Sequence, residues 1–172
     1  MLRKILSALS VLVMLGVFYL AVVVAGSENG VKREEPASLP SVGVVRSSSQ
    51  ADLAAVLGCP FPSTLADGAG EVKDARVGTL NARLLTWQSA DGLVISAVRP
   101  AAAAALIRHD GLTLITDTRW ELGPATVVIA VGEAGACAYY ETDDAAYALF
   151  LSGADADALL LRLSDGVTLP GG

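Results

Sequence analysis

The feature that most constrains this chain is a long uncharged run at its N-terminus. Arg3 and Lys4 are followed by residues 5–27, and no further charged residue occurs before Glu28. As an α-helix rising about 1.5 Å per residue, this apolar run is long enough to cross a hydrocarbon core about 30 Å thick. The sequence therefore predicts a transmembrane anchor over residues 5–27.

A cleaved signal peptide is the alternative interpretation of the same run. Signal peptides have a shorter apolar core, about 7–15 residues, and end at small residues. The length of the run favours an uncleaved anchor, although Val23-Val24-Ala25 before Gly26 is an acceptable cleavage site. Because positive charge precedes the run, we expect a single-pass protein of the cell membrane with residues 1–4 in the cytoplasm and the rest outside.

The composition of the chain after residue 27 predicts a linker followed by one acidic domain. After Ser27 the chain keeps all 18 acidic residues and ten of its 12 basic ones, a net charge of −8. Such a charge repels phosphate backbones and argues against nucleic-acid binding. The prolines, serines and mixed charges of residues 28–47 predict a flexible linker, followed by a domain over residues 48–168 and a short tail over residues 169–172.

Helix signals stand at both ends of this domain. Ser49 is suited to be an N-cap with Asp52 three residues on, and Gly58 can end the helix between them. Near the C-terminus, apolar residues return at helical spacing over residues 156–163, with Asp155 in the first turn, where the helix dipole favours it.

Strand signals fill the space between these helices. Patterns of period two and short apolar runs predict strands at residues 72–80, 82–89, 93–98, 112–116, 125–131, 136–141 and 145–151. The turn signals between the last three favour an antiparallel meander. Residues 100–107 predict a short helix or a loop. The fold class expected is therefore α+β, a single domain with an antiparallel sheet covered by N- and C-terminal helices.

Several segments together resemble a known bacterial family. They are Ser49-Gln50-Ala51, the turn Pro60-Phe61-Pro62, the strand 127–134, the pair Tyr139-Tyr140 and the closing segment 157–160. This pattern resembles the extracytoplasmic domain of unknown function 4367 of Gram-positive bacteria. That family stands behind one membrane helix, in some cases at the outer end of anti-sigma factors, and is distantly similar to lipoprotein-carrier folds. The resemblance implies an exported sensing or interaction module and supplies no catalytic residues.

Aromatic residues of the strands are the candidates for a ligand or partner surface. A tyrosine offers an apolar ring and a hydroxyl, and both tyrosine and tryptophan also pack in cores without further function. The candidates are Tyr139, Tyr140, Tyr147 and Trp87. Cys59 and Cys137 can form one disulfide in an oxidising exterior, or remain two buried free thiols.

Signals for catalysis, metals or cofactors are weak. His109 is the only histidine, and a site that pairs it with one of the cysteines would lack any nucleophile motif. The acidic residues Glu141, Asp143 and Asp144 have oxygen ligands for a hard cation but no EF-hand spacing. We therefore expect no catalytic, metal or cofactor-binding residues and no enzyme.

Two functions follow as hypotheses. The first is a membrane-anchored extracytoplasmic domain of non-enzymatic sensing or protein-interaction type, with an unknown protein partner. The alternative is a carrier or binding protein for a lipid or other small apolar ligand, held against a sheet face lined by small residues such as Ala136, Ala138, Ala146 and Ala148.

Overall fold

The computed structural model describes residues 41–115 and 119–170. The elements, in chain order, are β1 (Val44–Ser47), α2 (Gln50–Leu57), β2 (Ser63–Thr64), β3 (Gly68–Val77), β4 (Leu80–Ser89), β5 (Leu93–Arg99), the 3₁₀ helix η1 (Ala101–Ile107), β6 (Thr113–Leu114), β7 (Trp120–Leu122), β8 (Ala125–Gly132), β9 (Gly135–Glu141), β10 (Ala146–Ser152), α3 (Ala156–Gly166) and β11 (Val167–Thr168). The expected membrane span 5–27, the stub 1–4, most of the linker and the end of the tail lie outside the described residues. Within the described part, no helix has the length and apolar character needed to cross a membrane.

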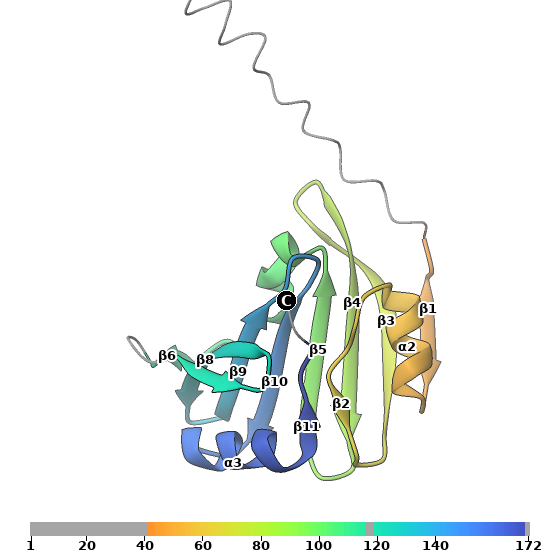
Figure 1. Ribbon diagram of the computed structural model, residues 1–172. Helices are drawn as coiled ribbons and strands as arrows, with labels where there is room; N and C mark the ends of the chain where they lie inside the picture. The colour runs from red at the N-terminus through yellow and green to blue at the C-terminus, as the bar shows by residue number, and fades with distance from the viewer. Residues whose placement is uncertain (1–40, 116–118, 171–172) are drawn as a thin grey trace, which may run out of the picture. The chain divides into compact units, whose positions relative to one another are not determined.

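One antiparallel sheet organises the domain, as the α+β prediction requires. Its strands run in the order β1-β3-β4-β5-β10-β9-β8-β6, and β7 pairs with β8 off this path (Figure 1). The hairpins β3–β4 and β4–β5 and the meander β8–β9–β10 join neighbours in sequence, whereas β5 pairs with β10 across the middle of the sheet. A separate two-stranded sheet pairs β2 with β11.

Both α-helices cover the same face of the sheet. Figure 1 shows α2 against β3 and β4, and α3 near β8 and β9. Leu53 and Leu57 of α2 and Leu159 and Leu163 of α3 are buried in one large cluster with Trp87 and other large side chains of the sheet. We call this the helix face. Residues Leu39–Gly172 form one compact unit, and its two hydrophobic clusters consist of its own residues, as in a domain that folds alone.

Local sequence explains how both helices begin. The Ser49 side chain accepts a hydrogen bond from the Asp52 N–H at 3.2 Å, and the Asp155 side chain accepts one from the Ala158 N–H at 2.8 Å. Each cap satisfies one backbone donor that the first turn leaves unpaired. Gly58 ends α2 in a left-handed conformation, φ 81°, that glycine adopts at little cost.

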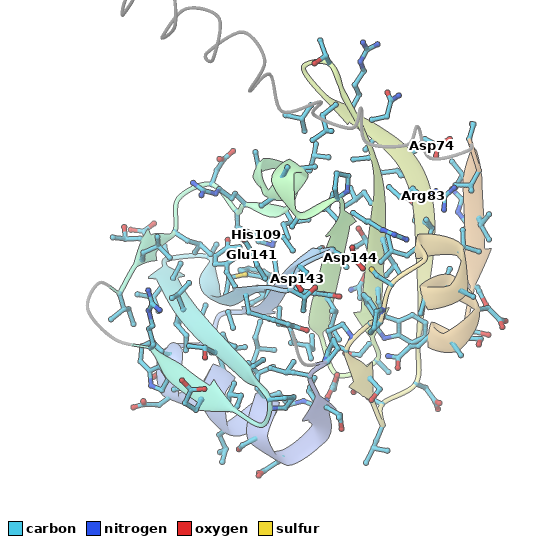
Figure 2. All side chains as sticks on the ribbon, turned by 45° about the horizontal axis from the view of Figure 1, so that its top comes forward. Asp74, Arg83, His109, Glu141, Asp143 and Asp144 are labelled. Atoms are coloured by element: carbon cyan, nitrogen blue, oxygen red, sulfur yellow. The ribbon has the colours of Figure 1, made fainter. Side chains whose placement is uncertain are left out.

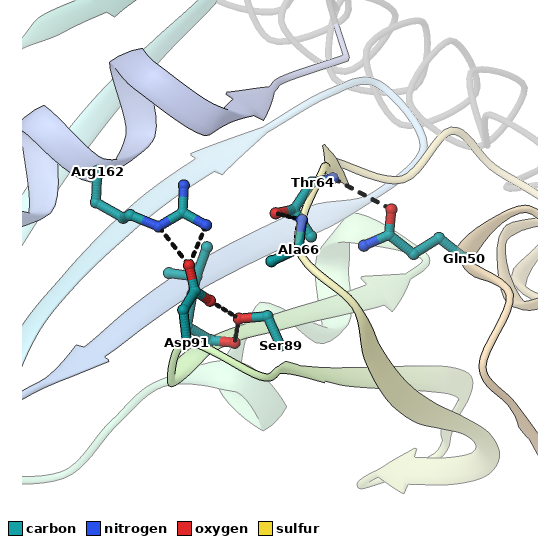
Figure 3. Close-up of polar contacts among 7 residues, drawn as sticks. Gln50, Thr64, Ala66, Ser89, Asp91 and Arg162 are labelled. Carbon is teal, nitrogen blue, oxygen red and sulfur yellow. Dashed lines mark hydrogen bonds and ion pairs between the residues drawn. The ribbon is translucent and has the colours of Figure 1, made fainter.

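Side chains of the sheet also fasten the helices. Arg83 of β4 donates to the Val56 carbonyl at 2.8 Å, and Arg99 of β5 donates to the Gly58 carbonyl, so the C-terminal carbonyls of α2 are partnered. On α3, Arg162 Nε donates to Asp91 Oδ2 at 2.8 Å, and Asp91 lies in the β4–β5 turn (Figure 3). The ion pair therefore holds α3 to a turn of the sheet 71 residues away in sequence.

The sheet begins earlier than the sequence indicates. Val44–Ser47, placed in the expected linker 28–47, form β1 and pair with β3. Asp74 of β3 holds the residues ahead of β1: its carboxylate accepts hydrogen bonds from the Ser41 hydroxyl at 2.6 Å and the Gly43 N–H at 3.0 Å. These partners lie about 30 residues away, so no local pattern marks the strand.

A glycine-rich segment is likewise part of the sheet rather than a loop ahead of it. Residues 68–70 open β3, where Gly70 pairs with Trp87 of β4. A Cβ on Gly70 would lie 2.5 Å from the Thr86 carbonyl oxygen and 3.0 Å from Leu53 Cδ1. The missing side chain therefore lets α2 pack closely on the sheet at this point.

Candidate ligand-binding site

The opposite face of the sheet carries a hollow of about 480 Å³. We call this side the open face. It lies over β8, β9 and the start of β10, and η1 with the segment that follows forms its wall. Its apolar lining consists of Ala104, Ile107, Leu112, Leu114, Val128, Ala130 and Ala146, and its polar lining of Arg108, His109, Arg119, Thr126, Tyr139 and Glu141.

The floor follows from alternation along the strands. Successive strand residues point to opposite faces, so Val128 and Ala130 of β8 face the hollow while Val127 and Ile129 enter the helix-face core. The register pairs Val128 with Tyr139 and Glu141 with Ala146, which brings side chains of three strands onto one floor. Ala130 and Ala146 are small and leave space that larger side chains would fill. The four alanines expected on one sheet face are divided: Ala146 lines the hollow and Ala148 lies in the same open-face cluster, while Ala136 and Ala138 lie in the helix-face core because strand side chains alternate.

The wall is fixed by small apolar residues. Ala103 and Ile107 of η1 are buried in a second cluster on the open face, together with Val98 and Ala148 of the sheet. The N–H of Ala101 donates to the Asp144 carbonyl at 3.1 Å, tying the start of η1 to the β9–β10 turn. A short helix of alanines packs closely but has little bulk, so it covers only part of this face.

His109 and Tyr139 form the polar corner of the hollow. The His109 ring stacks on Phe150 with centroids 4.5 Å apart, and its backbone N–H donates to the Tyr139 hydroxyl at 3.0 Å. Burial lowers the pKa of His109 and raises the pKa of Tyr139 to about 12. Both groups are therefore mainly neutral near pH 7 and act as hydrogen-bonding groups rather than charges.

The charged groups of the hollow are Arg108, Arg119 and Glu141. All three are exposed, and among the described residues none of them makes an ion pair or a side-chain hydrogen bond. Both His109 and Glu141, which Figure 2 labels, line the hollow. The hollow thus combines an apolar floor with charged groups that have no partner in the described part of the chain.

The predicted aromatic group is divided between the two faces. Tyr139 faces the hollow. Tyr140 and Tyr147 stack on one another in the helix-face core, with centroids 4.5 Å apart, and both also contribute to the lining of the hollow. The Tyr147 hydroxyl donates to the Pro60 carbonyl at 2.7 Å. Trp87 is 2 % exposed in the helix-face core and does not line the hollow.

Both cysteines are free thiols in this structure, and both are buried. Cys59 belongs to the helix-face cluster and Cys137 to the open-face cluster, and the sheet lies between them. Burial raises the pKa of both thiols, that of Cys137 to about 12. Such thiols stay protonated at neutral pH, which disfavours the nucleophilic use considered with His109.

The acidic residues considered for a cation do not gather into a ligand set. Glu141 lines the hollow, whereas Asp143 and Asp144 lie in the turn beyond it (Figure 2). Within residues 41–115 and 119–170, no group of three or more His, Cys, Asp or Glu residues is arranged to hold a metal ion.

Sequence reasoning did not single out the residues that shape the hollow most. Arg108, Arg119, Leu112 and Val128 carry no motif. One signal was available: between residues 100 and 152 the only basic side chains are Arg108 and Arg119, against seven acidic ones. Both of these cations line the hollow.

Comparison with protein-family models, curated proteins and solved structures finds no significant match to this chain. The resemblance to the extracytoplasmic family stays a prediction. The structure shows an α+β domain with an antiparallel sheet and a hollow of about 480 Å³ on one of its faces.

Proposed function

We propose that this is a non-enzymatic binding domain that holds a small, largely apolar molecule in the hollow of its open face. The hollow itself carries the proposal. Its volume of about 480 Å³ lies within the range of about 300–1,000 Å³ usual for small-molecule sites, and its lining is apolar with a few convergent polar groups.

The surface supports this function over protein docking. A large contiguous apolar patch is the surface feature that marks a hydrophobic docking site. The large hydrophobic side chains that are well exposed in the described part are Val44, Leu65, Leu114 and Leu161, and they lie on β1, the β2–β3 loop, β6 and α3. Only Leu114 belongs to the hollow. Holding a ligand is also the first step of sensing one, so the proposal serves a carrier and a small-molecule sensor alike.

The place of the tether is compatible with this function. In the proposal, the apolar run 5–27 anchors the protein in the cell membrane and leaves the domain outside. The chain enters the domain at β1, one edge of the sheet, whereas β8 beneath the hollow lies toward the other edge. A ligand can therefore reach the hollow without crossing the point of attachment.

Binding of a neutral apolar probe tests the proposal. The unit Leu39–Gly172 is titrated with N-phenyl-1-naphthylamine, whose fluorescence rises in an apolar site, and an organic extract of the unit is examined by mass spectrometry. We expect saturable binding of the probe to an unoccupied site, or a stoichiometric apolar molecule in the extract.

A matched pair of variants locates the binding. Val128 and Val94 are both half-buried on the open face, but only Val128 lines the hollow. Val128→Trp should fill the hollow and weaken probe binding at least tenfold, while Val94→Trp should leave it unchanged. Equal binding by the two variants, or no probe binding together with a clean extract, would refute the proposal.

A further inference from the structure

We infer that the ligand of the hollow is an amphiphile with an anionic head, held by Arg108 and Arg119 while its chain lies over the apolar floor. This inference deepens the proposed function and rests on it. It concerns the chemistry of the ligand, which neither the apolar lining nor the volume specifies.

The two arginines are the first support. They are the only basic residues between residues 100 and 152, a stretch with seven acidic residues, and both line the hollow. Neither the solubility nor the folding of the domain requires the only two arginines of this acidic stretch to line the same hollow. Binding of an anion gives such a reason.

The lack of partners is the second support. Elsewhere in the described part, Arg46 pairs with Glu71 and Arg162 with Asp91, and Arg83 and Arg99 donate to carbonyls. Arg108 and Arg119 have no such contact with the described residues. A guanidinium presents a planar fork of donors that matches the oxygens of a carboxylate or phosphate, so these two groups are ready for an external anion.

The floor supplies the other half of the ligand. Val128, Ala130 and Ala146 of the sheet and Ala104 and Ile107 of η1 offer apolar surface next to the arginines. A free inorganic anion would leave that surface uncovered, and a plain hydrocarbon would leave the arginines unused. An alkyl chain with an anionic head uses both.

Substitution of Glu141 is expected to change the binding affinity in a direction that depends on the charge of the ligand. Glu141 is the one carboxylate among the residues that line the hollow. Repulsion between Glu141 and an anionic head weakens binding, so Glu141→Gln should tighten it. A cationic ligand would show the opposite response at all three charged residues.

The test compares ligands with the same chain and different heads. The unit Leu39–Gly172 is titrated at pH 8 with laurate, dodecyl phosphate, 1-dodecanol and dodecyltrimethylammonium below their micelle concentrations, with displacement of the fluorescent probe as readout. We expect laurate, dodecyl phosphate or both to bind roughly tenfold more tightly than dodecanol, because hydrogen bonds to charged groups have about this effect.

Variants assign that preference to residues. Arg108→Gln combined with Arg119→Gln should remove the preference for the anionic heads and leave dodecanol binding within about twofold. Arg76→Gln, an exposed arginine that does not line the hollow, is the matched control and should change nothing. The inference is supported if the wild-type domain prefers the anionic heads and the double variant has lost that preference.

The outcomes separate this inference from the proposed function. If dodecanol and both anionic amphiphiles bind equally and the arginine variants have no effect, the head-group inference fails while the hollow stands. Tightest binding of dodecyltrimethylammonium likewise overturns it. If none of the four ligands displaces the probe, or the probe does not bind, the proposed function fails as well.

Discussion

The helix face and the open face of the same sheet are built from the same strands and differ in the size of their side chains. The helix face receives Trp87, Tyr147, Leu149 and other large residues, and α2 and α3 cover it. The open face receives Ala82, Ala146, Ala148 and Cys137 under a short 3₁₀ helix. Because the free energy of burial grows with the apolar area buried, we expect the helix face to contribute more to stability than the open face.

Strands β9 and β10 show the difference residue by residue. Ala138 and Leu149 are register partners and lie in the helix-face core, while Tyr139 and its partner Ala148 lie on the open face. The large side chain on the helix face fills the space beneath the helices. Each face thus receives one large and one small side chain from this pairing, and the faces differ in what covers them. The helices α2 and α3 cover the helix face, whereas the short η1 covers only part of the open face.

The largest loss of stability is expected from a substitution in the packed helix face. Leu149→Ala removes a fully buried side chain from the helix-face core and should lower the free energy of unfolding by about 2–5 kcal/mol. Leu112 is half-buried and lines the hollow. The Leu112→Ala variant should therefore lose much less free energy of unfolding than Leu149→Ala, because the Leu112 side chain is already partly exposed to solvent. Urea unfolding of the two variants measures the contrast, and equal losses would show that both faces contribute equally to stability.

A polar contact within the helix-face core gives the next largest effect. Tyr147→Phe keeps the ring stacked on Tyr140 and leaves the Pro60 carbonyl without its donor. The expected loss is about 0.5–1.5 kcal/mol in urea unfolding, since a partly buried hydrogen bond is removed. Tyr139→Phe on the open face is the comparison, and a loss as large as that of Tyr147→Phe would contradict the difference in burial.

A smaller effect is expected where α3 is held from its exposed side. Arg162→Gln removes the ion pair with Asp91, whose partners have side chains 24 % and 41 % exposed. Solvent screens such a pair, so the free energy of unfolding should fall by about 1 kcal/mol or less. The Asp91→Asn variant should be similar, and a loss beyond 2 kcal/mol in either would mean that α3 depends on this contact more than on its buried leucines.

The smallest effect concerns pH on the open face. Burial lowers the pKa of His109, with Asp110 opposing the shift, and Phe150, Tyr139, Arg108 and Glu141 are the other groups around it. The unfolded chain then binds a proton more readily than the folded one, so stability falls as pH decreases below the ordinary value of about 6.5 and stops falling below the folded pKa.

The His109→Gln variant should lack this part of the pH dependence. Urea midpoints at pH 7.5 and pH 5.0 are compared within each protein, because the substitution also removes the stacking on Phe150. Over this range the carboxyls of Asp74 and Asp91, whose pKa values hydrogen bonds lower, remain ionised. An unchanged difference between the two pH values in the variant would exclude His109 as its source.

Local sequence was sufficient for the regular elements. The N-cap Ser49 and the terminator Gly58 lie where the sequence predicts them, whereas Asp155, expected in the first turn of α3, is its N-cap. Strands β4, β5, β8, β9 and β10 fall within one or two residues of the patterns that predict them. Capping and alternation act within a few residues, so a single sequence contains the information. Residues 100–107, left between helix and loop, form η1.

Long-range pairing accounts for what was not predicted. Strands β1, β2 and β11 have two to four residues each and exist because partners elsewhere in the chain complete their hydrogen bonds. The three-residue β7 pairs locally with β8. The glycine-rich start of β3 is a strand because it pairs with β4, and the absence of a side chain on Gly70 leaves room for Leu53 of α2. Strands this short have too little pattern of their own to predict.

The candidate site shows the same division between local pattern and tertiary structure. Sequence determined that Tyr139 and Tyr140 point to opposite faces once the strand is given, because strand side chains alternate, and it determined the shortage of cations between residues 100 and 152. Only the tertiary structure decided which face the helices cover, and therefore that Tyr140 and Tyr147 pack in the core while Tyr139, Arg108 and Arg119 meet at a hollow. The physical reason is that covering a sheet face depends on where distant segments return in space, and alternation within a strand carries no information about that.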